Sequence, residues 1–241
     1  MPGDPHPFLV APDRFDKDGG VRFPQDEAHH VLRVVRLKIG DTCRVVDGQG
    51  GRFRVRLQGS ERDLIGVILE STREAEPERR LDLGFPVLRT GGRTDWLIEK
   101  GVEVGVDRFV PIAWERSIRG TSASARRRWE RIMREALKQS ERARLPSLAN
   151  EEAPLAAVGG GGLTILADPE GGEALPDLSA ARSVLLLVGP EGGVAAGERD
   201  LLCERGAVLW GLGSNRLRAE TAAIVGSHRL AGALRRAGAP A

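Results

Sequence analysis

SVLLLVGPEGG, residues 183–193, decides the fold class, because an unbroken apolar run ends there in a loop with three glycines. Such a run is typical of a strand that is buried on both faces, as in a parallel sheet covered by helices. LTILAD (163–168) and AVLWGLG (207–213) repeat the pattern, and we expect Gly- or Ala-rich helices between the three runs. The second half of the chain therefore predicts an α/β domain.

Further elements of this domain follow from the same periodicities. They are strands at LDLGFPVL (81–88) and RFVPIAW (108–114), and helices at 94–105, 124–144 and about 219–236. Thr94 or Asp95 is expected to cap the first helix, and Gly105 is expected to end it.

The first half predicts a small β-domain. GDTCRVVDGQGGRFRVRL (40–57) alternates apolar and polar residues on both sides of a glycine-rich turn at 47–51. Several short strands with tight turns favour a small barrel, preceded by a short helix from Glu27. The charged stretch 71–80 contains Pro77 and is a plausible linker, so we expect domains at 1–72 and 73–241.

Composition excludes several classes of protein. No apolar run approaches the roughly 20 residues that cross a bilayer, so no membrane partner is expected. MPGDPHPFLVAPDRF lacks the basic start and apolar core of a secretory signal, and this predicts a cytoplasmic protein. Cys43 and Cys203 stand apart with no paired spacing, so neither a metal site nor a disulfide framework is predicted.

Positive charge gathers in one stretch, although the net charge of the chain is only +2. From Arg116 to Arg144, ten basic residues, Arg119 among them, stand against three acidic ones. Arg suits phosphates and base edges better than Lys does, so this stretch is a candidate contact for nucleic acid. A general preference for Arg explains part of the pattern, since only four of the 36 basic residues are Lys.

Two loops follow apolar strands that we expect to be neighbours: LVGPEGG (187–193) and LGSNRLRAETA (212–222). Ligands of open α/β sheets bind beyond the carboxyl ends of strands, where glycines let the backbone approach closely. Each loop alone is compatible with a tight turn, but the pair favours a pocket. Neither matches GxGxxG or GxxxxGK[ST], which counts against a nucleotide- or phosphate-binding enzyme.

LLVGPEGG followed by LGSNRLRAETAA resembles the signature loops of the ribosomal RNA small subunit methyltransferase E family, which belongs to the SPOUT superfamily. HHVLRVVRLKIGD, LIEKGVEVGVDRFVPI, WERS and ALKQSERARLP are also similar to stretches of that family and occur in the same order. The resemblance implies an S-adenosylmethionine-dependent enzyme that methylates N3 of a uridine in 16S rRNA. It also implies an N-terminal PUA-like domain, a C-terminal α/β domain tied in a deep trefoil knot, and a homodimer with active sites at the subunit interface.

The resemblance places S-adenosylmethionine between the two loops. The residues it implies as cofactor-binding are Leu166, Val188, Gly189, Pro190, Glu191, Gly192, Gly193, Leu212, Gly213, Ser214, Leu217, Arg218 and Thr221. Glu191 either binds ribose hydroxyls or interacts with a helix dipole.

Three residues are candidates for the chemistry. The N3 proton of uracil must leave, and Arg218 or Arg142 could stabilise the charge that develops on the uracil oxygens. Glu220 could accept the proton or hold an arginine in place. For RNA binding the candidates are His30, Arg33, Arg36 and Lys38 of the first domain and Arg126, Arg127 and Arg128 of the basic stretch.

The chain departs from the family pattern at two places. Asn215 stands where the family usually has Arg, and Arg216 stands where it usually has a hydrophobic residue, which could shift an arginine contact by one position. Ser140-Glu141 stands where a small residue and then Gly are common. Two alternatives stay open: a SPOUT enzyme acting on a ribose 2′-hydroxyl or a guanine, and a non-catalytic RNA-binding protein.

Overall fold

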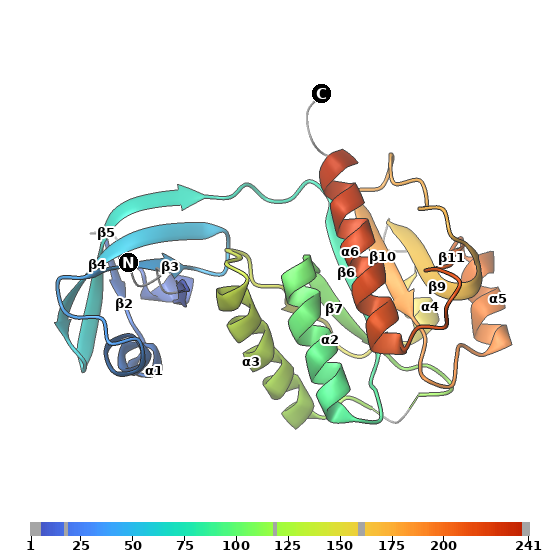
Figure 1. Cartoon of the computed structure of the whole chain (residues 1–241), viewed down its shortest axis with the longest axis horizontal. Helices are drawn as coiled ribbons and strands as arrows, with labels where there is room; N and C mark the ends of the chain where they lie inside the picture. The colour runs from blue at the N-terminus through green and yellow to red at the C-terminus, as the bar shows by residue number, and fades with distance from the viewer. Residues whose placement is uncertain (1–5, 17–18, 118–119, 159–161, 238–241) are drawn as a thin grey trace. The chain divides into compact units, whose positions relative to one another are not determined.

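The computed structural model describes residues 6–16, 19–117, 120–158 and 162–237 (Figure 1). The chain forms two compact units: unit 1 contains residues 1–76 and 134–145, and unit 2 contains residues 77–133 and 146–241. The division falls inside the long helix α3, Ala123–Gln139, whose last residues belong to unit 1.

Unit 1 contains a five-stranded mixed sheet with the order β1-β3-β4-β5-β2. Its strands are β1 (Phe8–Leu9), β2 (Gly20–Arg22), β3 (Thr42–Val46), β4 (Gly51–Ser60) and β5 (Asp63–Arg73). β1 runs parallel to β3, and the other pairs are antiparallel. Within the described ranges no ladder joins β1 to β2, so barrel closure stays a prediction.

The glycine-rich turn between β3 and β4 forms where the sequence predicts it. Gly48 and Gly50 have φ angles of +74° and +97°, which glycine adopts without strain. The buried Asp47 carboxylate accepts hydrogen bonds from the backbone N–H groups of Gln49, at 2.6 Å, and Gly51, at 2.8 Å. This local network fixes the register in which Cys43 pairs with Val55.

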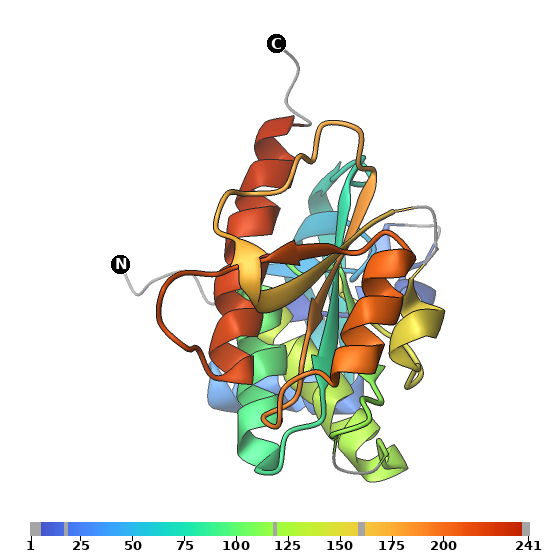
Figure 2. The same ribbon diagram turned by 90° about the vertical axis from the view of Figure 1, so that its right-hand side faces the viewer.

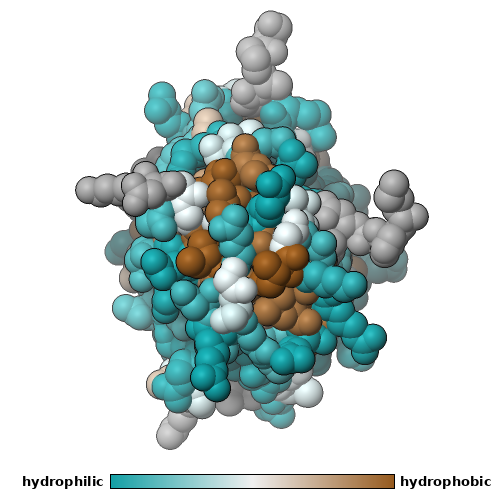
Figure 3. Space-filling view, turned by 90° about the vertical axis from the view of Figure 1, so that its left-hand side faces the viewer, coloured by the Kyte–Doolittle hydropathy of each residue, from teal (hydrophilic) through white to brown (hydrophobic). Residues whose placement is uncertain are grey.

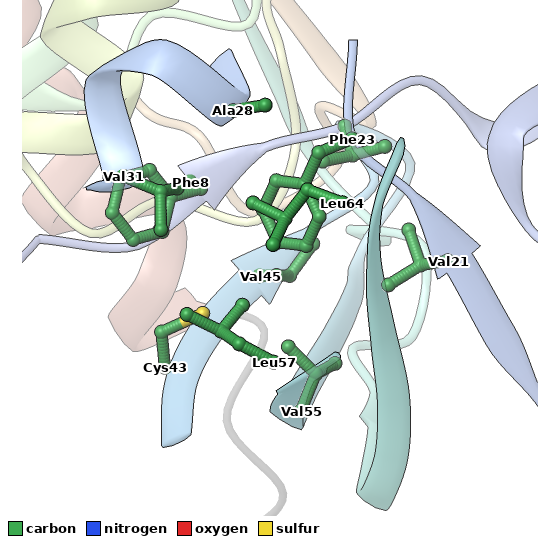
Figure 4. Packing of buried hydrophobic residues seen from close by; sticks show 11 residues of the cluster. Phe8, Val21, Phe23, Ala28, Val31, Cys43, Val45, Val55, Leu57 and Leu64 are labelled. Atoms are coloured by element: carbon green, nitrogen blue, oxygen red, sulfur yellow. The ribbon is translucent and has the colours of Figure 1, made fainter. Parts of the chain in front are cut away.

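The core of unit 1 lies on the apolar face of this hairpin (Figure 4). Cys43, Val45, Val55 and Leu57 are at most 2% exposed, as their alternation predicts. Ala28 and Val31 pack on the same core from helix α1 (Gln25–His29) and the π-helix η2 (His30–Val34) that follows it. A 3₁₀ turn, η1, spans Pro12–Arg14.

Unit 2 contains a parallel six-stranded sheet with the order β11-β9-β10-β6-β7-β8. Its strands are β6 (Arg80–Pro86), β7 (Arg108–Ile112), β8 (Ser147–Leu148), β9 (Leu163–Gly172), β10 (Ser183–Val188) and β11 (Val208–Trp210). The predicted parallel α/β sheet is confirmed. The two-residue strand β8 was not predicted. Of the helices expected between the strands at 163–168, 183–188 and 207–213, α5 (Ala196–Glu204) forms, but residues 173–182 between β9 and β10 contain no helix.

Helices cover both faces of this sheet (Figure 2). They are α2 (Gly91–Val104), the first part of α3, α4 (Pro154–Ala157), α5 (Ala196–Glu204) and α6 (Ala219–Ala237). Phe85 stacks edge-on against Trp129 of α3, whereas Leu202 of α5 packs with Leu166 and Leu187 on the opposite face. Coverage on both faces explains why β10 and the first half of β9, residues 163–167, are almost continuously apolar.

Two predicted helix ends were wrong. α2 starts at Gly91, because Thr94 is buried and its hydroxyl accepts a hydrogen bond from the Leu88 N–H at 3.1 Å instead of capping the helix. α3 stops at Gln139, because Glu141 adopts a φ of +55°. The predicted end at Gly105 is confirmed, with a φ of +103°.

Candidate functional site

A pocket of about 1140 Å³ opens in unit 2 where the parallel strands end. Its walls come from segments that follow four strands: Val87 and Arg89 after β6, Arg116 and Ser117 after β7, Val188–Val194 after β10, and Gly211–Ala219 after β11. Ala167 and Asp168 of β9 complete it. This is the end of an open α/β sheet at which ligands bind.

The pocket brings the two predicted loops together. We call residues 189–193 the first loop and residues 211–218 the second loop, and every residue of both lines the pocket. The expectation that they follow neighbouring strands was wrong, because β9 lies between β10 and β11. The middle strand therefore contributes Asp168, which the sequence analysis missed.

Glycine is required at particular points of these loops. A Cβ at Gly189 would lie 2.5 Å from Val194 Cγ2, a distance that real Cβ atoms essentially never show. Gly213 has a φ of +131° and Gly193 a φ of +75°, both in the region that favours glycine. The loops thus bring bare backbone to the pocket, where its N–H and C=O groups can meet a ligand.

An arginine that the sequence analysis missed links both sides of the pocket. Arg93, in the first turn of α2, donates from Nε and Nη2 to the two carboxylate oxygens of Glu220, at 2.7 and 2.6 Å. Its Nη1 donates to Glu191 Oε1 of the first loop at 2.5 Å. Burial opposes the charged form of Glu220, but these hydrogen bonds and the positive charges of Arg93 and Arg218 lower the pKa of Glu220 below its usual value.

The remaining charge in the pocket is unevenly placed. Arg216 and Arg218 are exposed on the second loop, and Arg116 donates to the Gly192 carbonyl at 3.3 Å. Asp168 and Glu173 are the acidic lining residues near β9. A ligand in this pocket therefore meets cationic side chains on one wall and carboxylates on another.

Most of the predicted cofactor residues line the pocket. They are Val188, Gly189, Pro190, Glu191, Gly192, Gly193, Leu212, Gly213, Ser214, Leu217 and Arg218. Leu166 is fully buried in the core beside Leu187, and Thr221, the third residue of α6, is not among the lining residues, although its neighbours Ala219 and Ala222 are. Arg142 belongs to unit 1 and is not among the lining residues.

The predicted RNA-binding residues of unit 1 lie on or just after η2. His30 meets Phe8 edge-on, and Arg33 donates to Glu61 at 2.8 Å, an interaction that lowers the pKa of that carboxyl. Arg36 and Lys38 are exposed, and Arg36 has a φ of +64°. Val34 and Ile39, which lie on either side of these two residues in the sequence, are 64% and 48% exposed, so this segment exposes both basic and apolar side chains.

Apolar side chains also gather among hydrophilic ones on the face that Figure 3 shows.

The three arginines of the basic stretch at 126–128 differ in their contacts. Arg126 donates to the Ala149 carbonyl at 2.5 Å and to the Leu148 carbonyl at 3.2 Å, so its side chain stabilises the fold. Arg128 forms an ion pair with Asp95. Arg127 is exposed, and Arg119 lies outside the described residues.

The residues that sequence reasoning missed share a recognisable signal. Arg89, Arg93, Arg116 and Asp168 are polar residues at or shortly after the ends of predicted strands. The rule that ligands bind at these ends could have found them. Only the two glycine-bearing loops had been examined in that way.

Among the described residues, no three His, Cys, Asp or Glu side chains are grouped in a way that could hold a metal ion. None of the helices described is long and apolar enough to cross a bilayer.

Comparisons with known proteins cover nearly the whole chain. Residues 75–231 match the model of an RNA methyltransferase domain, and residues 23–70 match that of an RNA methyltransferase PUA domain. The chain is 31% identical over 235 residues to the ribosomal RNA small subunit methyltransferase E of Synechocystis, a match that covers 90% of this chain and 74% of that protein.

Solved structures agree in fold. A probable rRNA methyltransferase from Porphyromonas gingivalis is similar with a TM-score of 0.79 and 28% identity, over 95% of this chain and 98% of that one. The ribosomal RNA small subunit methyltransferase E of Neisseria gonorrhoeae, bound to S-adenosylmethionine, gives a TM-score of 0.84 at 24% identity over the same shares.

Proposed function

Because the chain belongs to the ribosomal RNA small subunit methyltransferase E family, we propose that it transfers a methyl group from S-adenosylmethionine to N3 of a uridine in 16S rRNA. The observation that carries this proposal is the single pocket that both family-like loops line. The names of its relatives support the small-subunit RNA as the substrate.

The residues of the pocket fit S-adenosylmethionine. The volume of about 1140 Å³ suits a ligand of this size with part of a second one beside it. Gly189, Gly192 and Gly213 offer backbone hydrogen-bonding groups without side chains in the way, and Leu212 and Leu217 offer apolar contact for the adenine ring. When bound, this cofactor supplies an electrophilic methyl group on a sulfonium.

Residues of this chain would hold the uracil base and stabilise the negative charge that develops on it. Methyl transfer requires the donor and acceptor atoms to be close and aligned, and this positioning supplies much of the rate gain. Because N3 lies on the pairing edge, the uracil must be unpaired or extruded to react. The exposed Arg218 is placed to stabilise the negative charge on the uracil oxygens as the N3 proton leaves.

We extend the proposal to the assembly of the protein. Residues 1–72 form a PUA-like RNA-binding domain with a closed barrel, and residues 73–241 form the methyltransferase domain with a deep trefoil knot. Two copies form a homodimer in the cytoplasm, and Arg142 acts at the active site formed at their interface. The family membership supports these finer features.

RNA binding by unit 1 would use the basic and apolar segment around Arg33, Arg36 and Lys38, together with His30. Its exposed apolar residues Val34 and Ile39 could contact bases or sugars while the basic side chains contact phosphates.

The decisive experiment incubates the protein with labelled S-adenosylmethionine and either naked 16S rRNA or small ribosomal subunits, and identifies the methylated nucleoside by mass spectrometry. The proposal expects 3-methyluridine. A 2′-O-methylated or methylguanosine product would favour another SPOUT specificity. Calorimetry that detected no binding of S-adenosylmethionine would favour a non-catalytic RNA-binding protein.

A further inference from the structure

Arg93 occupies a position that neither the family signatures nor the two loops point to. It lies in the first turn of α2, Glu191 lies in the first loop, and Glu220 lies in the first turn of α6. More than 90 residues separate Arg93 from each carboxylate, so only the tertiary fold brings the three together.

The geometry of the cluster is specific. The guanidinium meets Glu220 with two parallel hydrogen bonds, at 2.7 and 2.6 Å, which is the fork arrangement that Arg can form and Lys cannot. Its third nitrogen meets Glu191 at 2.5 Å. Glu220 is buried, whereas Arg93 and Glu191 are partly exposed, with side-chain exposed fractions of 11%, 26% and 31% for Glu220, Arg93 and Glu191.

We propose that Arg93 is a positioning residue of this site, whose guanidinium fastens the first loop to the start of α6 and thereby fixes both walls of the cofactor pocket. The proposal rests on the function proposed above. α6 follows directly on the second loop, so a single side chain sets the distance between the two loops.

This arrangement also assigns a role to Glu220. Both of its carboxylate oxygens accept hydrogen bonds from Arg93, and this favours the role of holding an arginine in place over the role of accepting the uracil proton. The roles of Arg93 and Glu220 are therefore coupled, and removing both side chains should cost little more than removing one.

The test compares Arg93→Gln, Arg93→Lys, Glu220→Gln and the double variant Arg93→Gln/Glu220→Gln with wild type. Arg108→Gln is the matched control, because Arg108 also joins two carboxylates, Asp82 and Glu152, but does not line the pocket. Affinity for S-adenosylmethionine is measured by calorimetry, and methyl transfer to RNA is measured at saturating cofactor. Melting temperatures identify any variant that fails to fold.

Arg93→Gln should lower kcat by at least about tenfold, the scale expected when reacting groups are misplaced by a fraction of an ångström. Arg93→Lys should recover only part of the loss, the double variant should lie within about threefold of Arg93→Gln, and Arg108→Gln should stay within about twofold of wild type. In the Arg93→Gln variant, NMR of the Glu220 carboxyl carbon should show titration at higher pH than in wild type.

An Arg93→Gln variant with wild-type kcat, cofactor affinity and Glu220 titration would overturn the inference and leave the proposed function intact. A folded wild-type protein that bound no S-adenosylmethionine would overturn the proposed function itself, and this inference with it.

Discussion

At the scale of single residues, the proposed mechanism depends most on Arg218. It is exposed, lines the pocket and lies at the end of the second loop, immediately before α6. Because it is not packed in a core, its removal should leave the fold intact.

Arg218→Ala should therefore reduce methyl transfer by about 10²-fold or more, the loss typical of removing one group that stabilises developing charge. The melting temperature should change little. Single-turnover assays with 16S rRNA at saturating cofactor measure methyl transfer, and thermal unfolding measures the melting temperature. Full activity in this variant would remove Arg218 from the mechanism.

Glu141 explains the departure of this chain from the family pattern at 140–141. Its φ of +55° is the conformation for which a glycine is ordinarily used. The chain keeps the same turn with Glu, whose carboxylate accepts two hydrogen bonds from Arg44, at 2.9 and 3.1 Å. The ion pair offsets part of the backbone strain.

Glu141→Gly should change the free energy of unfolding by less than about 1 kcal/mol, because relief of strain and loss of the ion pair oppose each other. Glu141→Val should lower it by about 1–3 kcal/mol, because a β-branched side chain tolerates this conformation poorly. Urea unfolding followed by circular dichroism measures both. Equal stability of the two variants would contradict the strain argument.

At the scale of elements, Gly101 of α2 faces Phe109 of β7 and leaves no room for a side chain between the helix and the sheet. A Cβ at Gly101 would lie 2.6 Å from the Phe109 ring. This close approach sets the distance between α2 and the sheet, and α2 in turn carries Arg93 in its first turn.

Gly101→Ala should lower the free energy of unfolding by about 1–3 kcal/mol, because overpacking outweighs the gain in helix propensity. The matched control is Gly232→Ala in α6, where the nearest atom to a new Cβ is Arg236 Nη1 at 3.5 Å. It should be neutral or stabilising by up to about 1 kcal/mol. Thermal unfolding compares the two, and a Gly101→Ala variant at least as stable as wild type would refute this packing argument.

At the scale of the whole molecule, RNA binding should be governed by phosphate contacts. If four basic side chains each neutralise a phosphate of single-stranded RNA, affinity should fall by roughly fiftyfold between 50 and 200 mM salt. Fluorescence anisotropy with labelled RNA measures the slope, and binding of S-adenosylmethionine at the same salt concentrations is the control. An affinity independent of salt would exclude the basic segment around Arg33 and Arg36 as a main contact.

Periodicity located most elements correctly, but it failed where tertiary contacts override local signals. Thr94 has the side chain of a helix cap, yet its hydroxyl bonds to Leu88 instead. The order of β9, β10 and β11 likewise cannot be read from apolar runs, because each run is compatible with any place in a parallel sheet.

The sequence by itself determined the two-part organisation, the parallel sheet and the two loops that line the pocket, because apolar runs and glycines act locally. Only the tertiary structure decided that β9 separates the strands that lead to these loops, and that Arg93 joins Glu191 and Glu220. The physical reason is that these two ion pairs join residues that are 98 and 127 positions apart in the sequence, and pairs so distant leave no periodic pattern in the chain.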